Sequence, residues 1–249
     1  MIPKIIHYCW FGGNEKSEKI KFCMESWEKY LPDYEVKEWN ESNFPINKHK
    51  YVQQAYSEKK WAFVTDYVRA YALFEEGGIY LDTDVEVTGN LDVFLNHGAF
   101  SGFESKGYPF TALWGARKGH YWPKKVLNFY DTIEFVNETN TVYVSRILES
   151  EFGINSQSEV IQNFENDIFI YPSNYFCLNI RNYAIHHFEG SWVPSELKND
   201  VNRNLINLFT TNNFIKEKSF KQCVNILLKE YNVSALDLLK FSIKKYLFK

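Results

Sequence analysis

Two aspartates separated by one residue follow a short apolar stretch in the first half of the chain. Residues 79–81 have the character of a buried strand, and Asp82 and Asp84 come directly after them. On an extended chain, side chains two positions apart point the same way, so both carboxylates can face one point. Two oxygen ligands at a strand end suit a divalent cation that keeps open positions for a phosphate-bearing substrate. Because an isolated Asp-x-Asp is also common in solvated turns, the assignment depends on its surroundings.

The segment before the aspartates predicts a largely buried helix over residues 61–76. Apolar residues recur there at helical spacing on a face too broad for a surface helix. Gly77 and Gly78 supply the stop, since glycine tolerates the left-handed conformation after a helix. Asp66 and Arg69 interrupt the apolar pattern three positions apart, which places them on one face. Buried charges are costly unless they are paired or used, so the two are either a structural ion pair or part of a binding site.

Aromatic and imidazole side chains follow two other strand-like segments. Trp10 ends the apolar run of residues 2–9 and precedes a Gly-Gly turn. Its ring can stack on a nucleobase, or it can simply belong to the core. His186 and His187 end a later strand, and neutral imidazole is a common ligand for manganese and zinc. One of these histidines can complete a site with the aspartates, although a lone histidine is more often structural.

These segments, in this order, resemble glycosyltransferase family 32, an Asp-x-Asp group that includes bacterial capsule and lipooligosaccharide enzymes. The large clostridial glucosylating toxins look like more distant relatives. The resemblance covers about residues 1–195 and leaves the last fifty or so unmatched. The matching strings are Cys9-Trp10-Phe11-Gly12-Gly13, Asp66 with Arg69, Gly77-Gly78-Ile79-Tyr80-Leu81-Asp82-Thr83-Asp84, and His186-His187 with Ser191-Trp192.

The resemblance implies a GT-A-like fold, with one α/β domain, a mixed central sheet and the nucleotide at the strand ends. It implies a Mn²⁺ ion, or Mg²⁺ in its place, and transfer with retention of anomeric configuration. The expected reaction moves a hexose from a nucleotide-diphosphate sugar to a glycan or lipid-linked glycan acceptor. A UDP-sugar is favoured, because the Trp10 strand end resembles uridine-binding relatives. The implied setting is bacterial surface polysaccharide synthesis, for example of a capsule.

The resemblance also implies residue roles. The expected metal ligands are Asp82, Asp84 and His187, with His186 as the second choice of histidine. Asp66, Arg69, Asp82 and Asp84 would be the catalytic residues. The donor would be held by groups that stack, accept or donate hydrogen bonds, namely Cys9, Trp10, Phe11, Asp66, Arg69, Tyr80, Asp82, Ser191 and Trp192.

Two other function classes remain open at this point. Phosphatases of the haloacid dehalogenase type also place Asp-x-Asp at a strand end, with one aspartate as nucleophile. They usually carry Thr or Val two residues after the second aspartate, where this chain has Glu86. Detection of a covalent aspartyl-phosphate would distinguish such a phosphatase from a glycosyltransferase, which forms no such intermediate. The other alternative is a non-catalytic nucleotide-sugar-binding module, although a decayed site is expected to lose at least one of these residues.

The wider pattern is that of an α/β domain over 1–195 followed by a helical extension over 196–249. Alternating strand and helix signals continue through the first part, and helical periodicity dominates the second. In the first helix we expect Phe22 and Trp27 to face the core. The net charge of −3 excludes nucleic-acid binding by bulk electrostatics. The expected helices are 17–30, 47–58, 61–76, 120–131 and 141–152, and the expected strands are 4–9, 34–39, 79–81, 85–87, 99–103, 111–115, 169–171 and 183–187.

Compartment and membrane contact are also expectations at this stage. The four cysteines, Cys9, Cys23, Cys177 and Cys223, have no CxxC spacing, and the chain opens on a strand rather than a targeting sequence. Free thiols in a reducing cytoplasm follow from these features. Residues 240–249 carry four lysines among apolar residues. They form either an interfacial helix at the inner face of an anionic membrane or a terminal helix docked by its apolar face.

Overall fold

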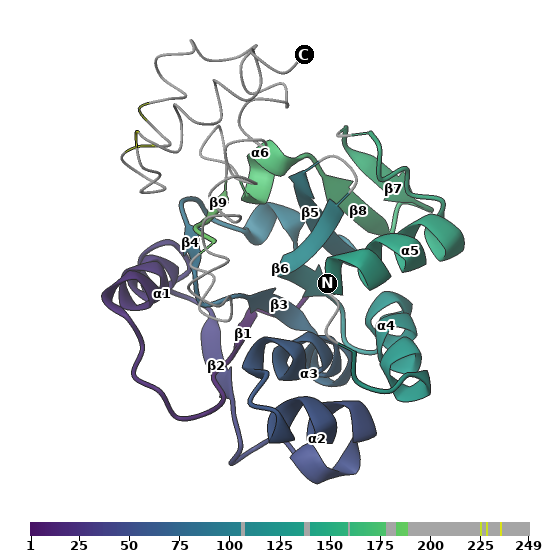
Figure 1. Cartoon of the computed structure of the whole chain (residues 1–249). Helices are drawn as coiled ribbons and strands as arrows, with labels where there is room; N and C mark the ends of the chain where they lie inside the picture. The colour runs from purple at the N-terminus through teal and green to yellow at the C-terminus, as the bar shows by residue number, and fades with distance from the viewer. Residues whose placement is uncertain are drawn as a thin grey trace. The chain divides into compact units, whose positions relative to one another are not determined.

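The computed structural model describes residues 1–105, 108–136, 140–158, 160–177 and 183–188, together with 225, 228 and 235. The chain divides into two compact units, Met1–His186 and His187–Lys249. All the helices and strands described below belong to the first unit (Figure 1). The expected extension over 196–249 lies almost wholly outside the described residues, so it and its boundary at 195 stay predictions.

A seven-stranded mixed sheet forms the centre of the first unit, in the order β2-β1-β3-β6-β5-β8-β7. β1 pairs in parallel with β2 and β3, whereas β6 runs antiparallel to β3 and β5. The predicted α/β architecture with a mixed sheet is therefore confirmed. The strands are β1 (Ile5–Cys9), β2 (Glu35–Trp39), β3 (Gly78–Leu81), β5 (Ala99–Ser105), β6 (Tyr108–Ala116), β7 (Gln162–Phe164) and β8 (Ile168–Tyr171).

A separate two-stranded sheet joins β4 (Val85–Val87) to β9 (Ala184–His186). The two strands are antiparallel, and Val85 lies opposite His186. This small sheet brings the segment after the aspartates together with a segment about a hundred positions later in the chain.

Helices α2, α3 and α4 lie together beside the central sheet, and α3 contacts both of the others as well as β1 and β3 (Figure 1). As predicted, α3 is largely buried, so it forms part of the core rather than a surface layer. α1 packs on β4 and α5 on β6. The helices are α1 (Glu18–Tyr30), α2 (Lys50–Ser57), α3 (Trp61–Glu76), α4 (Tyr121–Thr132), α5 (Asn140–Phe152) and α6 (Ser173–Phe176), with 3-10 turns η1 (Ile46–Lys48) and η2 (Asp92–Phe94).

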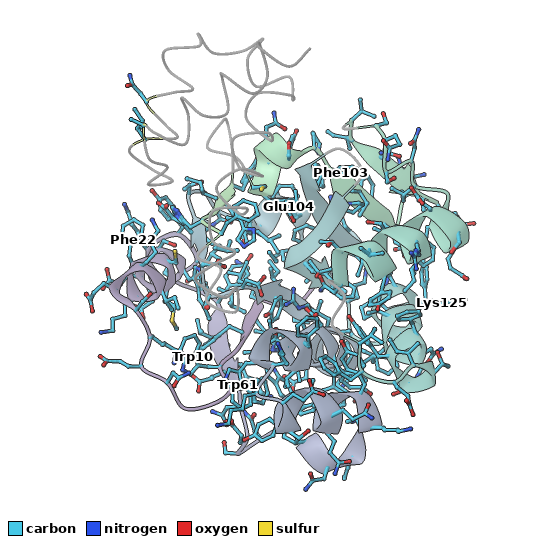
Figure 2. All side chains as sticks on the ribbon, viewed as in Figure 1. Trp10, Phe22, Trp61, Phe103, Glu104 and Lys125 are labelled. Atoms are coloured by element: carbon cyan, nitrogen blue, oxygen red, sulfur yellow. The ribbon has the colours of Figure 1, made fainter. Side chains whose placement is uncertain are left out.

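The first helix corrects one expectation. Trp27 is buried and donates its indole N–H to the carbonyl of Val85 at 2.7 Å, but 48% of Phe22 is exposed. Figure 2 labels Phe22 on the outer side of α1. Five positions on a helix correspond to a rotation of about 140°, so these two residues cannot share one face.

The junction between α3 and β3 fixes the strand that leads to the aspartates. Gly77 and Gly78 have φ angles of 72° and 115°, and a Cβ on Gly78 would lie 2.6 Å from the carbonyl oxygen of Ile5. The buried His7 donates from Nε2 to the carbonyl of Gly77 at 2.7 Å and accepts at Nδ1 from the indole N–H of Trp39 at 3.1 Å. Burial lowers the pKa of His7, so a neutral imidazole ties β1, β2 and this turn together.

Three of the cysteines, Cys9, Cys23 and Cys177, are buried thiols that form no disulfide, and Cys223 lies outside the described residues. Within the described ranges, no helix has the length and apolar character needed to cross a membrane.

Candidate active site

Asp82 and Asp84 occupy a tight turn between β3 and β4. The backbone N–H of Val85 donates to the carbonyl of Asp82 at 3.0 Å, and the N–H of Asp82 donates to the carbonyl of Ala112 on β6 at 2.7 Å. The expectation that an extended backbone aligns the two carboxylates is therefore wrong. The turn brings them together instead, and β6 anchors its first residue.

His186 joins the two aspartates. One ligand atom from each of Asp82, Asp84 and His186 lies within 4.8 Å of the others. His186 Nε2 is 3.3 Å from Asp84 Oδ1, as the pairing of β4 with β9 requires. Within the described residues, His186 is the histidine whose ring nitrogen lies close to both aspartates. Since the sequence favoured His187, we reverse the order of the two histidines and keep His187 as the second choice.

Arg69 connects this cluster to helix α3. Its guanidinium lies 3.0 Å from Asp66 and 3.3 Å from Asp82, and only 6% of the residue is exposed. It also donates to the carbonyl and hydroxyl of Thr111 at 3.1 and 3.0 Å, and to the carbonyl and hydroxyl of Thr65 at 3.3 and 3.1 Å. The predicted sharing of a helix face by Asp66 and Arg69 is confirmed, and all three guanidinium nitrogens contact protein oxygens.

Tyr80 holds Asp82 from a second side. Its hydroxyl donates to Asp82 Oδ1 at 2.8 Å, and its ring lies 4.7 Å from Arg69 Cζ. Burial raises the pKa values of Tyr80 and of the nearby Cys9 thiol, so both groups are neutral. One oxygen of Asp82 therefore accepts a hydrogen bond from Tyr80 and forms an ion pair with Arg69, which together set the orientation of this carboxylate.

The electrostatics of the cluster favour bound protons unless a cation replaces them. Burial raises the pKa of Asp66 to about 7 and also raises that of Asp82, with Arg69 opposing the shift in both. Burial alone would lower the pKa of His186, but the carboxylate of Asp84 raises it overall. Two carboxylates and an imidazole are a donor set that Mn²⁺ accepts, and metal binding would displace these protons. The residues present therefore fit a divalent cation.

The raised pKa of Asp66 predicts a stability profile. In the folded protein the Asp66 carboxyl keeps its proton up to about pH 7. In the unfolded chain the same carboxyl loses its proton near its ordinary pKa of 3.8. The native state therefore binds more protons between these values, and the free energy of unfolding falls as pH rises from about 4 to 7. We expect Asp66→Asn to flatten this slope in urea titrations with chelator present. An unchanged slope in the variant would show that Asp66 titrates near its ordinary value.

Glu104 on β5 was not anticipated from the sequence. Burial raises its pKa, and His186 partly offsets that shift, which places this carboxyl within electrostatic range of the cluster of Asp82, Asp84 and His186. The residue is half-buried, and it is labelled in Figure 2. A single glutamate in an apolar strand is not part of any recognisable sequence pattern. It lies near the site because of how the strands of the two sheets are arranged, with β5 beside β6 and β9 beside β4.

Trp10 is partly exposed, as a stacking platform needs to be. Its indole N–H donates to the carbonyl of Asn14 at 2.8 Å, and Lys16 Nζ lies 5.0 Å from the ring centre. Cys9 and Phe11 on either side are buried. The nucleotide-binding roles of these three residues stay predictions. The remaining two donor-site residues, Ser191 and Trp192, lie outside the described residues.

Comparisons with known proteins give a family match and a relative of partly similar sequence. Residues 17–101 match the family described as "Glycosyltransferase sugar-binding region containing DXD motif". A stretch of 127 residues is 32% identical to inositol phosphoceramide mannosyltransferase 3 of Schizosaccharomyces pombe (strain 972 / ATCC 24843). That stretch covers 48% of this chain and 34% of the relative, so the chain spans about a third of that protein's length.

The similar solved structures include two glycosyltransferases. One is the PaToxG glycosyltransferase, at 19% identity and a TM-score of 0.47, covering 60% of this chain and 69% of that one. The other is a glycosyltransferase involved in glycosylation of the major capsid of PBCV-1, at 14% identity and a TM-score of 0.39, covering 70% of this chain and 84% of that one.

The matched region contains α3, with Asp66 and Arg69, and the turn with Asp82 and Asp84. These are the residues that carried the resemblance in the sequence. Residues 17–101 of this chain thus match a glycosyltransferase sugar-binding region containing the DXD motif, in agreement with the resemblance found in the sequence.

Proposed function

We propose that this protein is a metal-dependent glycosyltransferase that moves a hexose from a nucleoside-diphosphate sugar to a glycan acceptor, with retention of configuration. One observation carries the proposal. The ligand atoms of Asp82, Asp84 and His186 lie within 4.8 Å of one another, beside the buried Asp66–Arg69 pair. The DXD sugar-binding region and the mannosyltransferase relative support the same chemistry.

A divalent cation at this cluster supplies Lewis-acid stabilisation of the departing diphosphate. The protein's own residues do the positioning. Asp82 is held in one orientation by Arg69 and Tyr80, so it meets the cation or a ribose hydroxyl without reorganisation. Arg69 is a positioning residue in this scheme, because its guanidinium nitrogens already contact protein oxygens. Asp66 bonds Arg69 through Oδ1, and its second oxygen can accept from a sugar hydroxyl.

The deciding experiment measures release of nucleoside diphosphate from a panel of UDP- and GDP-sugars, with Mn²⁺ and with chelator. We expect slow, metal-dependent release from one donor, because water can replace the acceptor. The panel also identifies the base and sugar. The sequence favours a UDP-sugar, whereas the relative named as a mannosyltransferase adds GDP-mannose as the competing donor. Calorimetry that detects no donor binding and an assay that detects no release would together contradict the proposal.

The two adjacent histidines provide a matched pair of variants. We expect His186→Ala to raise the Mn²⁺ concentration needed for half-maximal activity by about ten-fold or more, as expected when an ion loses a ligand. His187→Ala should leave the Mn²⁺ titration close to that of the wild type. The reverse result would make His187 the metal ligand, as the sequence analysis expected.

For Trp10, replacement by alanine should weaken binding of nucleoside diphosphate by about 1–3 kcal/mol, the usual contribution of a stacked base. Isothermal calorimetry with UDP and GDP measures the loss directly. Phe22→Ala removes an exposed aromatic ring from α1 and should leave the affinity unchanged. Equal affinity in wild type and Trp10→Ala would assign the indole to packing.

The proposed setting is the cytoplasm, with a glycan or lipid-linked glycan as acceptor and surface polysaccharide as the product. Contact of residues 240–249 with the inner face of a membrane is part of this proposal. Co-sedimentation with anionic liposomes, compared between the full chain and a chain ending at residue 239, tests that part separately. Equal co-sedimentation of the two would remove it.

A further inference from the structure

Thr111 on β6 contacts the buried guanidinium of Arg69 with both its main chain and its side chain. Nη1 of Arg69 donates to the Thr111 carbonyl at 3.1 Å and to the Thr111 hydroxyl at 3.0 Å. Only 1% of Thr111 is exposed, so bulk water does not compete for these bonds. Both of the hydrogen bonds that Nη1 makes within the described residues therefore end on Thr111.

These two bonds determine where the rest of the guanidinium points. The group is a rigid plane, so holding one of its nitrogens restricts the directions of the others. Nη2 faces the carboxylates, at 3.0 Å from Asp66 Oδ1 and 3.3 Å from Asp82 Oδ1. Thr65, on the same helix as Arg69, binds Nε and Nη2 at 3.3 and 3.1 Å. Thr111 is therefore the contact from the central sheet that directs Nη2 at Asp82.

The same strand also holds the backbone of Asp82. The N–H of Asp82 donates to the carbonyl of Ala112, the residue after Thr111, at 2.7 Å. β6 is itself paired on both sides, with β3 and with β5. Two consecutive residues of one well-supported strand therefore position both members of the Arg69–Asp82 ion pair.

Asn140 occupies the second acceptor position of the Thr111 hydroxyl. Its amide nitrogen donates to Thr111 Oγ1 at 2.7 Å, and a hydroxyl oxygen has two lone pairs, of which Arg69 takes the other. Asn140 is the first residue of α5, and α5 packs on β6 (Figure 1). Rotation of the Thr111 side chain to another rotamer would break both bonds, so the hydroxyl is fixed in place. Valine has nearly the same shape as threonine, so space filling does not explain the hydroxyl, whereas these two bonds do.

We infer that Thr111 and Asn140 are positioning residues for the candidate cation site, acting through Arg69 on the carboxylate of Asp82. Neither residue supplies a ligand atom in this scheme. Groups that orient metal ligands commonly change metal affinity or activity by about 10- to 100-fold when they are removed. This inference rests on the proposed function, because it requires that a divalent cation binds at Asp82.

The first measurement needs no metal. With chelator present, arginine side-chain NMR of the full chain reports whether a guanidinium rotates freely. We expect separate Nη signals for Arg69 in the wild type, assigned by their absence from Arg69→Met, because rotation is hindered by the bonds to Thr111. Thr111→Val should merge these signals, and Thr111→Ser, which keeps the hydroxyl, should retain them.

The second measurement is binding of Mn²⁺ alone, followed by electron paramagnetic resonance of the free ion. We expect Thr111→Val to weaken binding by about ten-fold, the lower end of the usual range for groups that orient a ligand. Thr111→Ser should bind Mn²⁺ with nearly wild-type affinity. Asn140→Ala should shift the affinity in the same direction as Thr111→Val but by less, because Arg69 keeps both bonds to Thr111.

Ser101→Ala is the matched control. Ser101 on β5 is fully buried, and its hydroxyl donates to the carbonyl of Leu113 on β6 at 2.7 Å. The variant therefore removes a buried hydroxyl that bonds the same strand at a different residue. It should leave the Arg69 signals and the Mn²⁺ affinity unchanged.

The outcomes separate this inference from the proposed function. Wild-type Arg69 signals and Mn²⁺ affinity in Thr111→Val would overturn the inference and leave the proposed function standing. A loss that also occurs in Thr111→Ser, or equally in Ser101→Ala, would overturn it too, because it would reflect a general effect on packing. Failure of the wild type to bind Mn²⁺ would contradict the proposed function, and the inference would fall with it. If Thr111→Val does not fold, Asn140→Ala decides, and wild-type Mn²⁺ affinity in that variant would overturn the inference.

Discussion

Replacement of Asp84 by alanine is expected to lower the proposed sugar transfer by about 10³-fold or more, because loss of a ligand to the proposed cation would remove several kcal/mol of transition-state stabilisation. The fold should survive. The turn is closed by a backbone bond from Val85 to Asp82, which does not involve the Asp84 side chain. The variant also relieves repulsion between two neighbouring carboxylates, since Asp84 is one of the groups that raise the pKa of Asp82.

The measurement is nucleoside diphosphate release, or transfer once an acceptor is found, with urea titration of the same samples. Asp92→Ala is the matched control, because it removes a carboxylate that bonds Lys4 and Tyr34 away from the site. It should retain full activity. A folded Asp84→Ala protein with near-normal transfer would exclude a metal-binding role for this residue.

Arg69→Met is expected to have the largest effect on stability, lowering the free energy of unfolding by about 3–5 kcal/mol. The buried guanidinium is paired with Asp66 and Asp82 and bonds the carbonyl and hydroxyl of Thr111. Methionine fills similar space but leaves these carboxylates and the carbonyl without their donor. The pKa values of both aspartates should then rise further, because Arg69 is the group that opposes the effect of burial.

Urea denaturation near neutral pH measures this loss. Arg117→Met provides the control, since Arg117 bonds Asp167 and the carbonyl of His97 with its side chain 44% exposed. Its effect should stay within about 1 kcal/mol. The double variant Asp66→Asn/Arg69→Met should be less destabilised than Arg69→Met, because the buried carboxyl that lost its partner is replaced by an amide that never ionises. If Arg69→Met costs no more than Arg117→Met, the buried network does not stabilise the fold.

The sequence predicted those features that depend on local periodicity. The broad apolar face of residues 61–76 gave the buried helix, and the i, i+3 spacing of Asp66 and Arg69 gave the ion pair at 3.0 Å. The strand before Asp82 and the alternation of strands and helices also depend on short-range patterns. The short elements β7 and α6 were missed, since three or four residues carry too little pattern to predict.

Features that depend on pairing between distant segments could not be predicted in the same way. The preference between His186 and His187 depends on the register of β9 against β4, which no local pattern specifies. Glu104 lies near the site only because of the arrangement of several strands. The error at Phe22 had a different origin, since helical geometry alone excludes its sharing a face with Trp27. Asp82 and Asp84 were expected on an extended backbone. A turn also brings their carboxylates together, and the residue types in this segment do not distinguish a turn from a strand.

The pairing of β4 with β9 also has a consequence for protein synthesis. A ribosome delivers the two aspartates well before it delivers His186, and domains fold as their segments emerge. A nascent chain can therefore build the parallel core of β1, β2 and β3 while its cation-binding set still lacks the imidazole. We expect products of premature termination upstream of His186 to lack a complete set of candidate metal ligands, so that the full set arrives only with β9.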